Sequence, residues 1–166
     1  MVSLYTGVKR ALTVLFNPAY PTGVWTVNAG GPKYTDAQGL IYRANTQFTT
    51  GHTGTTTAAI AGTTEDGLYQ SERWGTFAYA IPVANGDYRV TLKFAEIDWT
   101  QPAKRVFHVL MEGVKVLRNL DLVATVGPQA AYDVTLLVHV MDGKLNIALR
   151  PVVDYATVSA IVVQAN

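Results

Sequence analysis

The chain has 166 residues, charged residues make up 15% of it, and its formal net charge is +1. The length fits one domain with a proper hydrophobic core, and the near-neutral charge leaves no basic stripe for binding nucleic acid. The sequence has no cysteine, which excludes a disulfide framework and thiol catalysis, and no apolar run approaches the roughly 18 residues that a membrane span requires.

The first 23 residues differ in pattern from the rest of the chain. They contain one plausible strand, L-T-V-L-F, which ends at Asn17-Pro18. Lys9 and Arg10 precede this apolar run as in a signal peptide, but the run is short and no small-residue cleavage site follows. We therefore predict that residues 1–23 are a leader segment, a linker or an added edge strand, in front of a domain over residues 24–166.

The domain begins with short strands and a long loop. The strand from Val24 runs into Gly30 and Gly31, which predict a tight turn or a close backbone approach. Another short strand is predicted at residues 40–42. Residues 44–67 are rich in Thr, Gly and Ala and include His52, and a loop of that length is usually functional or mobile.

The stretch of residues 67–99 carries the strongest local signals. A strand running to Pro82 and a second strand over residues 87–97 flank Asn85-Gly86, which predicts a type I′ hairpin turn. Alternation in the second strand places four apolar side chains on one face: Tyr88, Val90, Leu92 and Phe94. The same phase would bury Glu96, so we expect either a bulge near Ala95 or a tethered internal carboxylate.

The remainder of the chain predicts two more hairpins and a last strand. Residues 105–111 and 114–117 flank Glu112-Gly113, and residues 132–140 and 145–149 flank Asp142-Gly143. A final strand is predicted at 157–163. Many short strands with repeated turn signals and no long helix predict an all-β fold, an antiparallel β-sandwich.

Two clusters of aromatic and charged side chains lie at the ends of the strands flanking Asn85-Gly86. The first contains Tyr69, Glu72, Arg73 and Trp74, and the second contains Glu96, Asp98 and Trp99. An aromatic face beside carboxylates suits a sugar, because the apolar C–H face of the ring stacks while the polar groups bond its hydroxyls. Trp99 falls out of phase with the apolar face, which favours an exposed platform over a core position.

Several motifs occur in order along the chain: V-N-A-G-G with a following Tyr-Thr-Asp, L-Y-Q-S-E-R-W, Y-R-V-T-L-K-F-A-E-I, K-R-V-F-H-V-L-M-E-G, K-L-N-I-A-L and V-S-A-I-V-V. Together they resemble the malectin family of carbohydrate-binding modules over about residues 24–165. The resemblance implies a jelly-roll sandwich of the galactose-binding-like type, with loops at one end forming the sugar site. In animal malectin, aromatic residues and an aspartate on four loops hold a glucose disaccharide of a high-mannose glycan.

Carried over to this sequence, the resemblance implies sugar-binding roles for Trp74, Asp98, Trp99 and Asp154. A further family aromatic would fall near Gly54, where this chain has none, and Asp98 stands where the family has an aromatic. His52 is the expected substitute for the missing ring. Four residues are expected to support the site: Tyr69, Glu72, Arg73 and Glu96, with Glu72 and Arg73 as a pair bracing the loop.

The resulting hypothesis is a non-catalytic module for a neutral oligosaccharide or polysaccharide, with glucans favoured. The alternative is a protein-interaction or adhesion module that has lost the sugar, which the missing aromatic near Gly54 favours. A third interpretation, a glycosidase using Glu96 and Asp98, lacks a deep cleft that would raise the pKa of an acid. No cofactor is expected, a structural calcium ion stays open, and we expect one module of a larger secreted or cell-surface protein.

Overall fold

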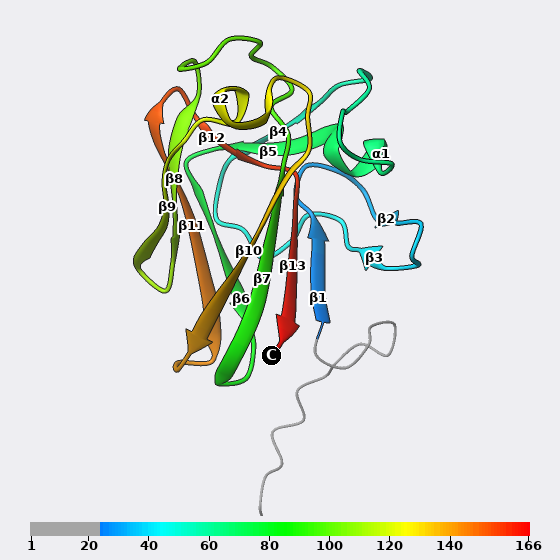
Figure 1. The fold of residues 1–166 in the computed structure, drawn as a ribbon. Helices are drawn as coiled ribbons and strands as arrows, with labels where there is room; N and C mark the ends of the chain where they lie inside the picture. The colour runs from blue at the N-terminus through cyan, green and yellow to red at the C-terminus, as the bar shows by residue number, and fades with distance from the viewer. Residues whose placement is uncertain (1–23) are drawn as a thin grey trace, which may run out of the picture.

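A computed structural model describes residues 24–166, and it forms two facing antiparallel sheets (Figure 1). The predicted β-sandwich is therefore confirmed. The first sheet has the strand order β1-β13-β7-β10, with the bounds Val24–Asn28, Ala160–Ala165, Gly86–Phe94 and Tyr132–Val140. The second has the order β6-β11-β8-β9, with the bounds Phe77–Pro82, Lys144–Val153, Val106–Met111 and Val114–Leu120.

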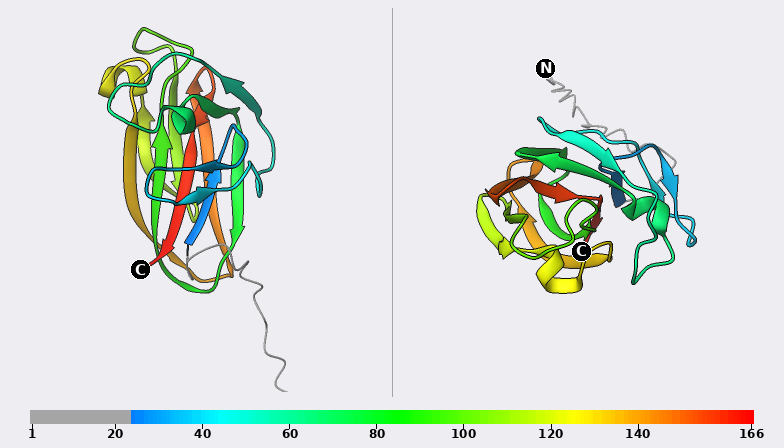
Figure 2. Two further views of the ribbon diagram at one scale, coloured as in Figure 1. Left: turned by 90° about the vertical axis from the view of Figure 1, so that its right-hand side faces the viewer. Right: turned by 90° about the horizontal axis from the view of Figure 1, so that it is seen from above.

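The main core fills the space between these two layers, which Figure 2 shows from the side and from above. The predicted apolar face of β7 is confirmed, because Val90, Leu92 and Phe94 are fully buried. They meet inward-facing residues of the second sheet, such as Phe77 and Leu149. Each such side chain contributes about 1.5–3 kcal/mol when removed from water, so the alternating strands fix the sandwich on which the loops are carried.

A third, smaller sheet lies across one end of the sandwich (Figure 1). Its strand order is β12-β5-β4, with the bounds Ala156–Val158, Ser71–Gly75 and His52–Thr55. The expectation of a loop over residues 44–67 was therefore partly wrong. The alternation signal was absent in β4 because its residues are His, Thr and Gly, and the strand is held by its ladder with β5.

A second apolar cluster covers the outer face of β13 and is built around Tyr42, Ile60, Leu68 and Val162. The elements around it are short: β2 at Tyr34–Thr35, β3 at Ile41–Tyr42 and α1 at Asp66–Tyr69. A second short helix, α2, spans Leu122–Val126. No helix within residues 24–166 is long and apolar enough to cross a membrane.

Two of the three predicted hairpins are wrong. β6 pairs with β11, whereas β7 pairs with β10 and β13, so Asn85-Gly86 links the two sheets and makes no hairpin. Asp142-Gly143 also crosses between sheets, from β10 to β11. The Asn85 side chain ties the two crossings together, since it donates to the Met141 carbonyl and accepts from the Gly143 amide.

The hairpin at Glu112-Gly113 is confirmed, and both residues have positive φ. The predicted final strand is interrupted at Ser159, so that β12 and β13 belong to different sheets. The predicted close approach at Gly30 is confirmed, because a Cβ there would lie 2.2 Å from the Glu72 carbonyl oxygen. The strand predicted within residues 1–23 lies outside the described residues.

Candidate functional site

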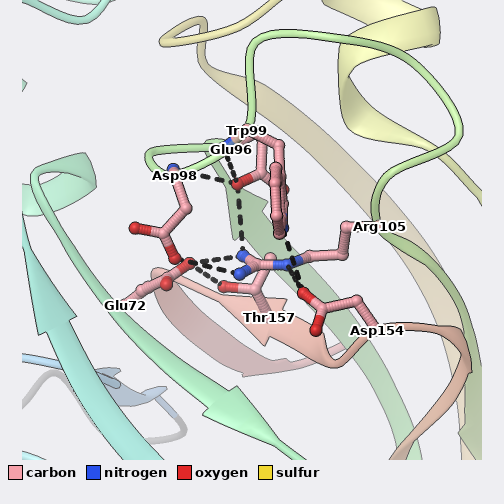
Figure 3. A network of polar contacts seen from close by, with 7 residues as sticks. All are labelled: Glu72, Glu96, Asp98, Trp99, Arg105, Asp154 and Thr157. Atoms are coloured by element: carbon pink, nitrogen blue, oxygen red, sulfur yellow. Dashed lines mark hydrogen bonds and ion pairs between the residues drawn. The ribbon is translucent and has the colours of Figure 1, made fainter.

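A buried arginine organises the loop end of the sandwich. Arg105 lies just before β8 and is 4% exposed. Its Nη1 lies 3.0 Å from Glu72 Oε2 and 3.3 Å from Glu96 Oε1, and its Nη2 lies 3.0 Å from Asp98 Oδ2. Its Nε lies 3.7 Å from Asp154 Oδ2. We call these four carboxylates and Arg105 the carboxylate network (Figure 3).

Glu96 resolves the alternatives left by the sequence. It is 1% exposed, and its Oε1 accepts hydrogen bonds from the backbone amides of Asp98 and Trp99, both at 3.0 Å. The carboxylate is thus an internal anchor that shapes the loop after β7. This loop turns the side chains of Asp98 and Trp99 outward, whereas Glu96 and Ile97 stay buried.

Glu72 is the other fully buried carboxylate of the network. Its Oε2 accepts from Arg105 and from the Thr157 hydroxyl on the neighbouring strand. Burial raises the pKa of Glu72 to about 7, against the opposing effects of Arg105 and Thr157. Burial likewise raises the pKa of Glu96, although Arg105 and two amides oppose this.

The pKa of Arg105 is raised as well. Burial alone would lower it, but the carboxylates of Glu72 and Glu96 outweigh burial. One guanidinium is shared among four carboxylates, so each buried glutamate recovers only part of its lost hydration. The network therefore has four carboxyl groups for one guanidinium.

Glu72 and Arg73 are both buried, as expected, but they do not pair with each other. Neighbours on a strand point to opposite faces, so Arg73 turns away from Glu72. Its Nη1 donates to the Thr50 carbonyl at 2.8 Å, and its guanidinium lies 3.5 Å from the centre of the Phe48 ring. Arg73 supports the segment that leads into β4.

Trp99 and two aspartates form the exposed part of the network. The Trp99 indole Nε1–H donates to Asp154 Oδ2 at 3.0 Å, and the side chain is 39% exposed. The Asp98 and Asp154 side chains are 56% and 28% exposed. A fixed indole beside two accessible carboxylates can stack on an apolar surface and accept hydrogen bonds from vicinal hydroxyls.

Three further rings form a row, which we call the aromatic strip. His52 lies opposite Trp74 in the β4–β5 ladder, and their ring centres are 4.7 Å apart. Trp74 lies 5.1 Å from Tyr155, which is 46% exposed. The structure thus brings the predicted residues His52 and Trp74 into contact, and Tyr155 enters from the turn between β11 and β12.

Sequence reasoning missed Arg105 and Tyr155. Arg105 stands in the quoted K-R-V-F motif, but nothing local shows that an arginine is buried. Tyr155 directly follows Asp154, and an aromatic residue beside a predicted ligand in a loop was a usable signal. Tyr69, predicted to support the site, belongs to the second apolar cluster and donates to Asp133 at 2.6 Å.

The network has no free catalytic acid at Glu96, which is committed to Arg105 and two amides. Among residues 24–166, no three His, Cys, Asp or Glu side chains lie together so as to hold a metal ion. The arrangement is suited to holding a polar ligand with apolar faces.

The family model described as Malectin domain matches residues 23–161. Malectin of Mus musculus is 36% identical over 132 residues, which cover 75% of this chain and 45% of the mouse protein. A β-glucuronidase of Bacteroides uniformis aligns with a TM-score of 0.78 at 17% identity, over 86% of this chain and 18% of that protein.

The ANX1 ectodomain of Arabidopsis thaliana aligns with a TM-score of 0.75 at 11% identity, over 86% of this chain and 48% of that protein. At these identities the two structures show a shared fold alone. The chain spans less than half the length of the mouse relative that it matches.

Proposed function

The chain belongs to the malectin family of carbohydrate-binding domains, and from this premise we propose that it recognises a neutral oligosaccharide or polysaccharide, with glucans favoured. The malectin-named relatives are binding proteins rather than enzymes. The observation that carries the proposal is the pairing of a fixed, half-exposed indole at Trp99 with the accessible carboxylates of Asp98 and Asp154.

Each exposed residue has a distinct part in the proposed complex. The Trp99 and Trp74 rings stack on the apolar faces of sugar rings, and Asp98 and Asp154 accept hydrogen bonds from hydroxyls. His52 forms the rim beside Trp74. A carboxylate acceptor holds a hydroxyl more strongly than a neutral acceptor does, since charge-assisted hydrogen bonds are about twice as strong.

The charge of the site supports a neutral sugar. Four carboxylates surround one guanidinium, and that guanidinium is buried and engaged. A uronic acid at Trp99 would meet the carboxylates of Asp98 and Asp154, whose shared cation Arg105 is already engaged, and like charges repel. Neutral hexoses avoid this cost.

A glycan array of α-glucans, β-glucans, galactans and xylans, followed by calorimetric titration of the best ligand, tests the proposal. Trp99→Ala should abolish binding, whereas Trp99→Phe should retain part of it because the stacking face remains. Leu137→Ala is the matched control, since Leu137 is 71% exposed on β10 and takes no part in the network. A folded wild-type protein that binds nothing on the array would support the alternative, a protein-interaction module.

We also propose that the domain works as part of a larger secreted or cell-surface protein. The ANX1 structure that shares the fold is an ectodomain, and the mouse relative is more than twice as long as the matched region. Shallow sugar sites bind weakly alone, and linkage to a second binding module raises avidity through effective concentration. Titration of the longer natural protein against an immobilised glucan would reveal such a gain.

A further inference from the structure

The outer face of the second sheet carries a group of basic side chains. His108 on β8 lies opposite Arg150 on β11 in the ladder. Their strand neighbours Val109 and Leu149 point into the core, so His108 and Arg150 point away from it. β9 pairs with β8 on its other side and adds two cations (Figure 1). We call the whole set the basic face: His108, Lys115, Arg118 and Arg150.

The ring of His108 shows that the cations of β9 lie close to it. Burial and the charges of Lys115 and Arg118 lower the pKa of His108. Its Nδ1 accepts a hydrogen bond from the Asn119 amide at 3.0 Å, so the neutral ring carries its proton on Nε2. The groups that the basic face offers to a ligand are therefore all donors: two guanidiniums, one ammonium and one imidazole N–H.

The charges of the basic face are not neutralised by ion pairs. Its ammonium and its two guanidiniums form no ion pair with any residue within 24–166. The carboxylates at the two ends of β9 are held by backbone amides instead. Glu112 accepts from the Asn146 amide at 2.6 Å, and Asp121 accepts from the amides of Ala103 and Ala124. The formal net charge of +1 thus hides a local excess of positive charge.

Protection of a sheet edge explains only part of this arrangement. Basic side chains on an edge strand discourage pairing with another strand, and β9 is the edge strand of its sheet. Two register shifts in the β8–β9 ladder already make β9 a poor template for a further strand. Arg150 lies on β11, inside the sheet between β6 and β8, where no edge needs protection.

Exposed aliphatic side chains lie at both ends of the basic face. Val114, next to Lys115 at the start of β9, is 65% exposed. Val152 and Val153 lie just beyond Arg150 at the end of β11 and are 50% and 43% exposed. A soluble polyanion gains from the cations alone. A layer of lipid headgroups gains from both kinds of side chain, because apolar groups enter the acyl boundary while cations attract anionic lipids.

We propose that the basic face docks onto a membrane surface that contains anionic phospholipids. Arg118 and Arg150 bind headgroup phosphates, whose oxygens match the fork of a guanidinium, and Lys115 adds a third positive charge. The three exposed valines enter between the headgroups. No residue of the basic face belongs to the carboxylate network, so this proposal and the proposed sugar binding can fail separately.

Sedimentation of the full chain with phospholipid vesicles tests the proposal. We expect binding to vesicles of equimolar phosphatidylcholine and phosphatidylglycerol, no binding to phosphatidylcholine alone, and weaker binding as salt screens the charges. Arg118→Gln/Arg150→Gln should lower the partition coefficient roughly tenfold or more, at about fivefold for each cation near an anionic surface. The matched control is Lys33→Gln/Arg89→Gln, which removes the same charge from exposed positions on other strands and loops and should change binding by less than about twofold.

A third variant separates lipid from other polyanions. Val114→Gln/Val153→Gln keeps every charge and should weaken vesicle binding several-fold, whereas binding to soluble dextran sulfate should not change. Full vesicle binding by this variant, together with tight binding to dextran sulfate, would identify a soluble acidic polymer as the partner and overturn the proposal. Equal losses in the two charge variants, or no binding of folded wild-type protein to the anionic vesicles, would overturn it as well. Thermal unfolding of each variant serves as the folding control.

Discussion

Replacement of Arg105 by Met removes the only cation of the carboxylate network while keeping an apolar stem. Glu72 is fully buried and Glu96 is 1% exposed, so their charges would be left without an opposite charge. Breaking a buried ion pair in this way costs about 3–5 kcal/mol. The contacts with the more exposed Asp98 and Asp154 add less than about 1 kcal/mol.

The loss should depend on pH. Without Arg105 the pKa of Glu72 rises further above about 7, the value that burial gives it in the native protein. At pH 5 Glu72 then takes up a proton, which removes its unpaired buried charge and relieves part of the lost stability. At pH 8 this relief is absent. Arg105→Met should therefore lose more stability at pH 8 than at pH 5, measured by urea unfolding and tryptophan fluorescence.

A matched control is Arg89→Met on the exposed outer face of β7, where we expect a change within about 0.5 kcal/mol. The double variant Arg105→Met/Glu72→Gln should be more stable than Arg105→Met alone, because one unpaired buried charge is gone. A loss below about 1 kcal/mol at pH 8, or an equal loss at both pH values, would refute this account of the network.

Three other measurements address the fold. The carboxyl group of Glu72 has a higher pKa in the folded than in the unfolded protein, so its ionisation lowers stability as pH rises from 4.5 to about 7. Glu72→Gln should therefore make Tm depend less steeply on pH over this range. An unchanged slope of Tm against pH would contradict the raised pKa of Glu72. Gly30→Ala should cost about 3 kcal/mol in urea unfolding, because its Cβ would overlap the Glu72 backbone. Gly54→Ala, whose nearest contact would be 3.3 Å, should stay within about 1 kcal/mol. Asp121→Ala removes the acceptor for the Ala124 and Ala103 amides and should cost about 1–2 kcal/mol in thermal unfolding; no change would show that water replaces the cap.

The two wrong hairpin predictions show that a turn motif does not predict which strands pair. Asn85-Gly86 and Asp142-Gly143 have the residues that reverse a chain, and the chain does reverse at both places. Whether the following strand pairs with the preceding one or crosses to the facing sheet is not encoded in the turn. That choice depends on which apolar faces pack. β7 pairs with β13 and β10 in the first sheet and buries its apolar face against the second sheet.

The carboxylate network had one visible clue in the sequence. Glu96 falls in the buried phase of β7, and this anomaly correctly predicts a tethered carboxylate or a bulge. Its partner could not be found in the same way, since Arg105 occupies an irregular segment before β8. No periodicity applies to such a segment.

The sequence by itself determined the all-β class, the buried face of β7 and the aromatic residues of the loops, because each follows from local pattern or from motifs a few residues long. At Gly30 it left a tight turn or a close backbone approach open. Only the tertiary structure decided that Glu72 meets Arg105 and Thr157, which lie 33 and 85 residues away in the chain. It also decided that Tyr155 packs on Trp74. The physical reason is that contacts across the sandwich depend on strand order and register, which the burial of all the strands sets together.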